Sequence, residues 1–566
     1  MTFRTLRILP LLIIAALLPL TAFAQEKWCT SPEYPTHYFR QPLDLPVSLS
    51  GTFAEIRPNH FHGGVDFRTG GKTGQPVHAA AEGYVSRIAI SPWGGGKVLY
   101  ITHPNGYRTV YMHLDAFCGA AGRFVADYQR QHQVYAMDVD LPADSIRVAK
   151  GEVVAYSGNT GASGGPHLHY EVRYAENDQP INPLYFGVNF TDNVNPTIRG
   201  IKVYPRDGQP YALKGDTIAS SGPFYLGIYA TDLSELGSGK NGAEAIELYV
   251  DGELFFRYCV PTFLYETTRG INALIDYPEY CRSGQYYIVS RVLPGNPNPF
   301  PTAYRDSGWL SFPDSGVVHQ LRYRVLDLKG NAAEKTFYVK SLDFGPEAER
   351  PSSIAHRGVA VAYRLPFSYS VPGFSVEIPA GSLYDNDYLV YSTANVANAY
   401  SKGHALSLSV NGLPPHNAIT LTLPVPRQKA IPAIEKLVVV CQSGSKRTAL
   451  PTHYDAANDC LVATSKTWGT FAVAADTTAP TVKPGNFTPG KAFQGKQIKV
   501  RLSDNLAGVH AYHCYVNDEW VLAEYDGKTT ALYIDAGVLA KGRNTLRVEA
   551  ADGCGNQRTE TYTLLR

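Results

Sequence analysis

The sequence has no excess of either charge. Its 566 residues contain 51 Lys and Arg against 50 Asp and Glu, a formal net charge of +1, and charged residues make up only 18% of the chain. Typical soluble domains carry about 25%. Because a polyanion needs a basic surface to hold it, we expect no nucleic-acid partner.

Long apolar runs are missing beyond the first 24 residues. No later stretch approaches 18 consecutive apolar residues, so we expect no membrane span in the mature protein. The first residues combine a basic start, a 13-residue apolar run from Ile8 to Leu20, and an A-x-A site that ends at Ala24. This pattern is typical of a secretory signal peptide over residues 1–24. We therefore expect an exported protein, either periplasmic or extracellular.

The cysteines show no C-x-x-C spacing, which argues against a thiolate metal site or a redox motif. Eight cysteines are an even number in an exported chain, where structural disulfides are common. Proximity along the chain predicts four pairs, of which the last contains the two cysteines that remain: Cys259–Cys281, Cys441–Cys460, Cys514–Cys554 and Cys29–Cys118.

Turn-forming and aromatic residues are abundant. The chain has 51 glycines, 39 prolines and 38 tyrosines, and 44% of its residues are hydrophobic. At about 150 residues per domain, the length predicts about four domains, and the composition predicts a mainly β protein. We expect the boundaries to follow the clustered histidines and the shifts in composition: residues 25–190, 191–345, 346–475 and 476–566.

Two of these segments look like copies of one unit. Residues 191–345 contain DNVNPT at the start and RVLDLKGN near the end, whereas residues 476–566 contain DTTAPT and RVEAADGCGN. Alternating strands around D-x-x-G-N predict a hairpin in each copy, and the recurrence predicts two immunoglobulin-like β-sandwiches. One acid per hairpin, Asp327 or Asp552, offers too few oxygens for calcium, so we expect turn-forming aspartates.

The segment between the copies, residues 346–475, begins with a linker-like stretch and is predicted to be β-rich. Within it, residues 378–383 read IPAGSL and resemble a ZU5-type segment. We assign this module no fold from its sequence.

Histidine is concentrated in three segments of the first domain. They are residues 59–66 (NHFHGGVD), 110–114 (VYMHL) and 164–172 (GGPHLHYEV). Side chains at positions i and i+2 of a strand share a face. His167 and His169 should therefore lie side by side, and Tyr111 should share a face with His113.

A hydrolytic zinc site needs about three nitrogen or oxygen ligands and one open position for water. Two histidines and one carboxylate leave the ion positively charged, which lowers the pKa of a bound water towards about 7. His62, Asp66 and His169 meet that count. His113 and His167 would then be free to move a proton and to stabilise an oxyanion. His60 lacks a carboxylate at i+4, so we expect an ordinary loop residue.

The motifs H-x-G-x-D, Y-x-H-L and G-x-H-L-H-[YF]-E-V resemble those of the lysostaphin-like, or LytM-type, zinc metallopeptidases over residues 50–185. The resemblance implies an antiparallel β-sheet domain with an active-site groove and bacterial peptidoglycan as substrate. It also implies one Zn²⁺ per chain and these roles: metal ligands His62, Asp66 and His169, and catalytic residues His113 and His167.

An insert at residues 116–147 makes the interval from His113 to His167 longer than is usual in this family. Residues 123–131 predict a short helix within it. The insert could narrow specificity, dock a partner or hold the enzyme latent, and the sequence leaves these alternatives open.

We therefore expect an exported zinc endopeptidase that hydrolyses peptide crosslinks of peptidoglycan. The alternative is a non-catalytic LytM-type regulator that binds the wall or activates another hydrolase. Such regulators typically look degenerate at the five positions that this chain keeps. A third hypothesis, adhesion or assembly by the β modules, leaves those five residues unexplained. The insert and the β modules are candidate surfaces for a protein partner.

Overall fold

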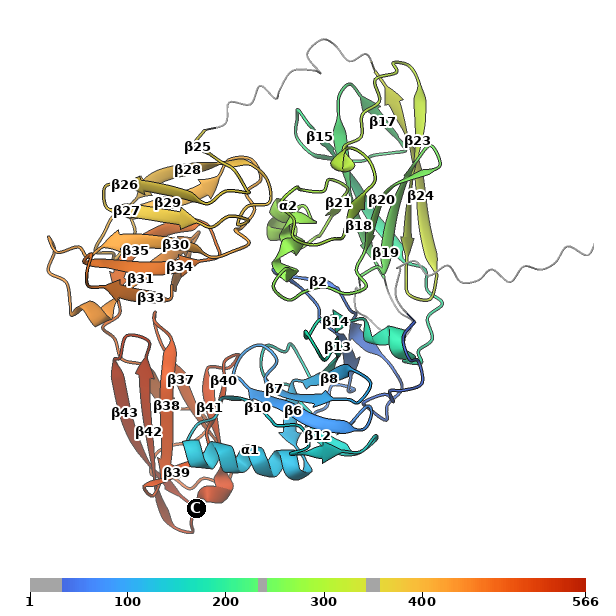
Figure 1. The fold of residues 1–566 in the computed structure, drawn as a ribbon. Helices are drawn as coiled ribbons and strands as arrows, with labels where there is room; N and C mark the ends of the chain where they lie inside the picture. Colours follow the sequence, from blue (N-terminus) through green and yellow to red (C-terminus); the bar gives the residue numbers. More distant parts are fainter. Residues whose placement is uncertain (1–32, 233–241, 343–356) are drawn as a thin grey trace, which may run out of the picture.

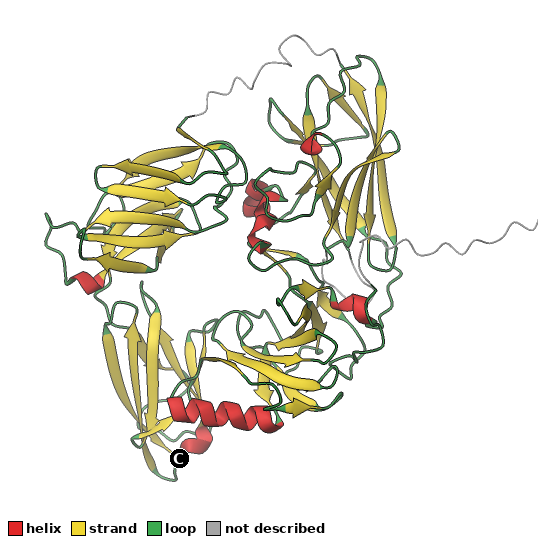
Figure 2. Ribbon diagram, in the orientation of Figure 1, coloured by secondary structure: helices red, strands yellow, loops and turns green. Residues whose placement is uncertain are grey.

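The computed structural model describes residues 33–232, 242–342 and 357–566. Strands dominate and helices are few (Figure 2), which confirms the mainly β class. Across these ranges no helix is both long and apolar enough to span a bilayer. The predicted signal peptide, residues 1–24, lies outside the described residues, as does Cys29.

The N-terminal domain is built on a nine-stranded antiparallel sheet. Its order is β1–β4–β13–β8–β7–β6–β10, with β11 beside β6 and β14 beside β13. Its strands are β1 (Leu49–Gly51), β4 (Val65–Arg68), β6 (Gly83–Ile90), β7 (Lys97–Thr102), β8 (Tyr107–Met112), β10 (Met137–Asp140), β11 (Arg147–Val148), β13 (His167–Tyr174) and β14 (Pro180–Ile181). Two smaller sheets complete the domain. One pairs β2 (Ile56–Arg57) with β3 (His60–Phe61), and the other has the order β5 (Pro76–His78), β12 (Val153–Ser157) and β9 (Leu114–Phe117). The 3-10 helix η1 (Pro183–Phe186) follows β14.

Alternation along β13 separates the two faces of this sheet. Leu168, Tyr170 and Val172 are 0–2% exposed and belong to the main hydrophobic core. The residues between them, including His169 and Glu171, point to the opposite face. One strand thus supplies both apolar packing and polar chemistry.

The insert contains helix α1 (Gly119–His132), which confirms the predicted helix and extends it at both ends, mainly the N-terminal one. In Figure 1 this helix lies beside strands of the C-terminal module. Tyr135, just beyond the helix, lines a pocket together with Glu524, Tyr525 and Asp526 of that module. The insert therefore contacts the chain's own C-terminal module.

The second module has two sheets around one core that also takes in Phe53, Ile56 and Phe61 of the N-terminal domain. The first sheet contains β16 (Tyr211–Ala212), β15 (Thr197–Pro205), β18 (Phe224–Thr231) and β21 (Ile288–Val289). The second contains β17 (Thr217–Ser220), β24 (Ala332–Ser341), β23 (Val318–Leu326), β19 (Ala245–Val250), β20 (Glu253–Cys259) and β22 (Thr302–Ala303). The helices are η2 (Thr268–Ala273), α2 (Tyr277–Ser283) and η3 (Asp306–Gly308).

The third module also consists of two sheets with a core of their own. One contains β25 (Val359–Val361), β28 (Asp387–Ala394), β29 (Gly403–Leu408), β35 (Gly469–Ala475), β31 (Leu437–Ser443) and β32 (Lys446–Ala449). The other contains β26 (Phe367–Val371), β27 (Phe374–Ile378), β30 (Ile419–Pro424), β34 (Cys460–Ser465) and β33 (Thr452–Asp455). The 3-10 helix η4 (Ile434–Lys436) precedes β31.

The C-terminal module pairs two four-stranded sheets. One sheet contains β36 (Thr481–Pro484), β37 (Gln497–Ser503), β41 (Ala531–Asp535) and β40 (Glu524–Asp526). The other contains β39 (Glu519–Val521), β38 (Val509–Val516), β42 (Arg543–Asp552) and β43 (Gln557–Leu565). The 3-10 helix η5 (Ala536–Val538) follows β41. The predicted D-x-x-G-N hairpins are confirmed as β23–β24 and β42–β43. The immunoglobulin-like assignment and the module boundaries stay predictions.

The C-terminal module packs back onto the N-terminal domain (Figure 1). Lys97 Nζ lies 2.9 Å from the Glu524 carboxylate, and the Lys97 side chain is only 11% exposed. The Trp93 ring covers Gly527 so closely that a Cβ there would lie 2.2 Å from it. These contacts place the last module beside the loops of the first.

The four predicted cysteine pairs are wrong, because six cysteines are free thiols: Cys118, Cys281, Cys441, Cys460, Cys514 and Cys554. Cys514 lies opposite Val548 in the β38–β42 pair. β42 continues for four residues from Val548 to Asp552, about 13 Å at about 3.3 Å per residue, and Cys554 lies in the turn beyond its end, whereas a disulfide needs Cα atoms within about 7 Å. Cys441 and Cys460 lie in different sheets. Closeness in sequence did not translate into closeness in space.

Alkylation of the denatured, unreduced protein should therefore modify Cys441, Cys460, Cys514 and Cys554. Their free thiols need no reduction before they react. Mass spectrometry of the peptides measures the modification. A disulfide-linked peptide that joins any two of them would contradict the structure.

Candidate metal centre and active site

Neighbouring strands bring the three predicted metal ligands together. Asp66 on β4 lies directly opposite His169 on β13. His62 follows β3, four residues before Asp66. All three residues are buried, with exposed fractions of 3–6%. A polar cluster of this kind needs partners for every donor and acceptor.

Three side-chain atoms converge here, namely His62 Nε2, Asp66 Oδ1 and His169 Nδ1, at 2.8–3.0 Å from one another. The outer nitrogens of both rings are engaged as donors. His62 Nδ1 donates to the Thr52 carbonyl at 2.7 Å, and His169 Nε2 donates to Glu171 at 2.8 Å. In neutral rings both inner nitrogens then carry lone pairs. Three electron-pair donors facing one point fit a divalent cation.

Charge and burial act together on these groups. Burial lowers the pKa of His62 despite the nearby carboxylate. Burial opposes ionisation of Asp66, but the three histidines around it outweigh this and hold its pKa well below the usual range. Burial also disfavours a charged His169, yet its two carboxylate partners raise its pKa to about 9. A proton on His169 and a metal ion therefore compete for the same lone pair.

The two predicted catalytic histidines lie next to this point. The ring centres of His113 and His167 are 4.7 Å apart, and His167 Nε2 lies 3.5 Å from Asp66 Oδ1. Each ring donates from Nδ1 to a backbone carbonyl at 2.8 Å, His113 to Thr160 and His167 to Gly165. Burial, together with the other histidines, lowers the pKa of His113 to about 3. Its ring therefore stays neutral near neutral pH, and with Nδ1–H bonded to Thr160 its lone pair lies on Nε2.

The predicted alternation around His113 is wrong. Tyr111 is fully buried and its hydroxyl accepts from the Ala80 amide on the core side. Regular alternation would send His113 to that side too. Instead His113 has a φ of 61°, a left-handed conformation that costs a non-glycine residue about 1–3 kcal/mol. This break between β8 and β9 turns the imidazole towards His167.

Three charged residues that the sequence analysis missed support the donors. Glu171 Oε1 accepts from His169, and Arg173 Nε donates to Glu171 Oε2 at 2.5 Å. Burial opposes the Glu171 carboxylate, but Arg173 and His169 outweigh it and lower its pKa to about 2. Arg57 Nη2 donates to the outer oxygen of Asp66 at 2.7 Å. A spacing of two along β13 could have identified Glu171, whereas Arg57 carries no sequence signal.

His60 and His103 take no part in this cluster. His60 is exposed at the start of β3, with Nδ1 2.8 Å from the Pro58 carbonyl. His103 is buried between the Glu82 carbonyl and Thr109 Oγ1. Burial lowers the pKa of His103 to about 4, so it is a neutral structural residue.

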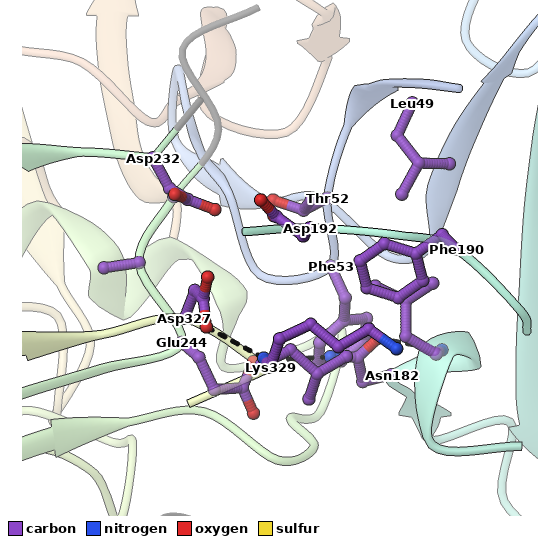
Figure 3. A pocket seen from close by; sticks show the side chains of 14 residues that line it. Leu49, Thr52, Phe53, Asn182, Phe190, Asp192, Asp232, Glu244, Asp327 and Lys329 are labelled. Atoms are coloured by element: carbon purple, nitrogen blue, oxygen red, sulfur yellow. Dashed lines mark hydrogen bonds between the residues drawn. The ribbon is translucent and has the colours of Figure 1, made fainter. Parts of the chain in front are cut away.

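Two further sets of acids lie outside this site. The repeated modules each bring three aspartates together, namely Asp192, Asp232 and Asp327 in one and Asp476, Asp504 and Asp552 in the other. The first set lines a pocket between the N-terminal domain and the second module (Figure 3). Each hairpin contributes one acid, but folding brings two more to it from distant parts of the module, so the argument that too few oxygens meet there is wrong.

The predicted turn role of the hairpin aspartates is confirmed. Asp327 Oδ1 accepts the backbone amides of Lys329 and Asn331, both at 2.8 Å. Asp552 repeats the pattern two and four residues on, at 2.9 and 2.8 Å. Both turns thus use the aspartate carboxylate in place of a backbone acceptor.

Two segments of the chain match known protein families. Residues 60–131 and 136–183 match peptidase family M23. Residues 359–476 match a Zu5-like domain, which supports the resemblance of residues 378–383 and extends it over the module.

Curated proteins resemble the first of these segments. The chain is 35% identical over 156 residues to an uncharacterized metalloprotease of Haemophilus influenzae, covering 26% of each chain. It is 36% identical over 123 residues to the DD-carboxypeptidase/endopeptidase Mpg of Neisseria meningitidis, covering 22% of each. It is 29% identical over 161 residues to the peptidoglycan DD-endopeptidase ShyA of Vibrio cholerae, covering 27% of this chain and 31% of that one. The chain thus spans less than a third of the length of these relatives.

Solved structures match the same region. The catalytic domain of lysostaphin from Staphylococcus simulans aligns at 22% identity over 25% of this chain and 93% of its own, with a TM-score of 0.19. The catalytic domain of EnpA from Enterococcus faecalis aligns at 25% identity over 27% and 98%, with a TM-score of 0.20. On the strength of the family match and the named relatives, this chain carries a LytM-type domain of peptidase family M23 in residues 60–183.

Proposed function

We propose that this chain is an exported zinc endopeptidase that hydrolyses peptide crosslinks of bacterial peptidoglycan. The observation that carries the proposal is the convergence of His62 Nε2, Asp66 Oδ1 and His169 Nδ1 beside two further histidine rings. The relatives from N. meningitidis and V. cholerae are named as a DD-carboxypeptidase/endopeptidase and a peptidoglycan DD-endopeptidase, which supports the substrate class.

His62, Asp66 and His169 would hold one Zn²⁺ through these three atoms. Two neutral imidazoles and one carboxylate cancel one of its two charges, so the site keeps a net positive charge. When bound, the ion supplies the Lewis acidity that makes water a nucleophile near neutral pH. Arg57 engages the outer oxygen of Asp66, which leaves the inner oxygen directed at the ion.

His113 and His167 would handle the protons of the reaction. Peptide hydrolysis needs one proton taken from the attacking water and one delivered to the leaving amine. Both rings are held by Nδ1–H bonds to carbonyls, so Nε2 is free to accept. After accepting a proton, an imidazolium beside the reacting carbonyl also stabilises the negative charge that develops on its oxygen.

A non-catalytic regulator is the alternative function. The donor geometry disfavours it, because a regulator has no need for three buried metal donors with two free imidazoles next to them. The contact of the insert with the C-terminal module also gives residues 116–147 a partner within the chain, so a separate protein is not required to explain them.

Digestion of purified cell wall tests the two functions. The protein should release crosslinked stem peptides as monomers with new free amines, measured by mass spectrometry of the soluble fragments. The fragment masses identify the bond that is cleaved. Unchanged crosslinks together with cosedimentation of protein and wall would instead favour the regulator.

A further inference from the structure

One loop of the second module reaches the metal-binding segments of the peptidase domain. This clamp loop runs from Phe263 to Thr268, after β20. The Phe263 ring packs on Phe61 at 5.3 Å between centres, one residue before His62. Thr268 Oγ1 accepts the backbone amide of Phe61 at 2.8 Å. The loop is therefore anchored to the segment that carries a proposed metal ligand.

The tip of the clamp loop contacts the second histidine ligand through a carboxylate. The Tyr265 hydroxyl donates to Glu171 Oε2 at 2.9 Å, and Glu171 Oε1 accepts from His169 Nε2 at 2.8 Å. The Arg173 guanidinium lies 4.7 Å from the centre of the Tyr265 ring. Tyr265 is 37% exposed as a whole, but its hydroxyl lies on Glu171, which is only 2% exposed.

The backbone at Gly63 lies close against this contact. Gly63 occupies the position directly after His62, the first variable position of H-x-G-x-D. A Cβ at Gly63 would lie 2.4 Å from the Tyr265 hydroxyl and 2.7 Å from Glu171 Oε1. No real Cβ tolerates such distances, so any larger residue would displace the hydroxyl, the carboxylate or both. The peptidase motif and the clamp loop are thus sterically matched.

We propose that Tyr265, contributed by the second module, is a positioning residue for the metal ligand His169 and acts through Glu171. The inference rests on the proposed zinc site. With Tyr265 and Arg173 both donating to Oε2, Oε1 is the oxygen left for His169 Nε2–H. That bond keeps the proton on Nε2 and the lone pair on Nδ1, where the metal would be held. The second module is then part of the catalytic unit.

Tyr265→Phe tests this directly, because it deletes the hydroxyl and keeps the ring on Arg173. Zinc affinity, measured by competition with a chromogenic chelator, should fall about tenfold. Loss of a residue that supports a metal ligand by hydrogen bonding typically lowers affinity about 10–100-fold. The visible spectrum of the Co²⁺-loaded protein should also change, since it reports ligand geometry. Tyr304→Phe is the matched control, because Tyr304 lies in the same module and is 51% exposed. This variant should leave the zinc affinity and the Co²⁺ spectrum unchanged.

A double-mutant cycle separates positioning from general packing. Glu171→Gln alone should weaken zinc binding, and adding Tyr265→Phe should then have little further effect, because the route through Glu171 is already broken. Affinity of Tyr265→Phe within twofold of the parent, or effects that add fully in the double variant, would overturn the inference.

Failure of the inference and failure of the proposed function give different results. If the unmodified protein binds zinc tightly and Tyr265→Phe binds it equally well, only the role of Tyr265 is wrong. If the unmodified protein binds no zinc, the zinc function itself fails and the inference fails with it. The melting temperature of the metal-free proteins shows whether any variant has lost its fold.

Discussion

Replacement of Asp66 by alanine should remove the bound zinc and abolish cleavage of peptidoglycan. The substitution deletes the one carboxylate among the three donors, and Arg57, which donates to it, keeps only Glu55 at 3.6 Å as a carboxylate partner. The loss of zinc affinity should exceed the roughly 10–100-fold expected when a residue that hydrogen-bonds to a metal ligand is removed. Metal analysis after dialysis should fall from about one zinc per chain to none.

Asp138→Ala provides a control for this experiment. Asp138 forms an exposed ion pair with Arg87 at 2.6 Å in the same domain, and such pairs contribute at most about 1 kcal/mol. This variant should keep its zinc and its activity. Full zinc occupancy in Asp66→Ala would remove Asp66 from the ligand set.

Replacement of His113 or His167 should slow cleavage by about 10²-fold or more while zinc stays bound. Neither ring is one of the three converging donors, so the metal content should be unchanged. His113→Asn is the better variant at the first position, because asparagine adopts the left-handed backbone at 61° more readily than alanine. Rates on purified wall, corrected for zinc content, measure the effect.

His60→Ala is the matched control for the histidine variants, since His60 is exposed and outside the cluster. It should cleave wall at the rate of the unmodified protein. Loss of zinc from a folded His113 or His167 variant would show that the proposed division between ligands and proton carriers is wrong.

Local patterns were enough to predict much of the N-terminal domain. The alternation in residues 167–174 predicts that His167 and His169 share a face, and β13 has this arrangement because a strand repeats every two residues. The D-x-x-G-N turns and the helix of the insert also follow from neighbouring residues alone. The metal and catalytic roles of the individual side chains stay predictions until variants are measured.

Two predictions that needed distances between remote residues failed. The cysteine pairs assumed that nearby positions meet, but Cys514 and Cys554 lie at separated points along β38 and beyond β42. The acids were counted one hairpin at a time, although three meet in each repeated module. In both cases strand register and sheet pairing decide which side chains meet.

By itself, the sequence determined the mainly β class, the motif-bearing segments and the residues able to bind a metal, because these depend on composition, spacing and strand periodicity. Only the tertiary structure decided that a left-handed residue turns His113 into the site, that Arg57 holds the outer oxygen of Asp66, and that Tyr265 reaches Glu171 from another module. The physical reason is that such contacts depend on how separate sheets pack and where the backbone leaves its regular conformation. Those outcomes are set by the sum of many distant interactions, and no local pattern records them.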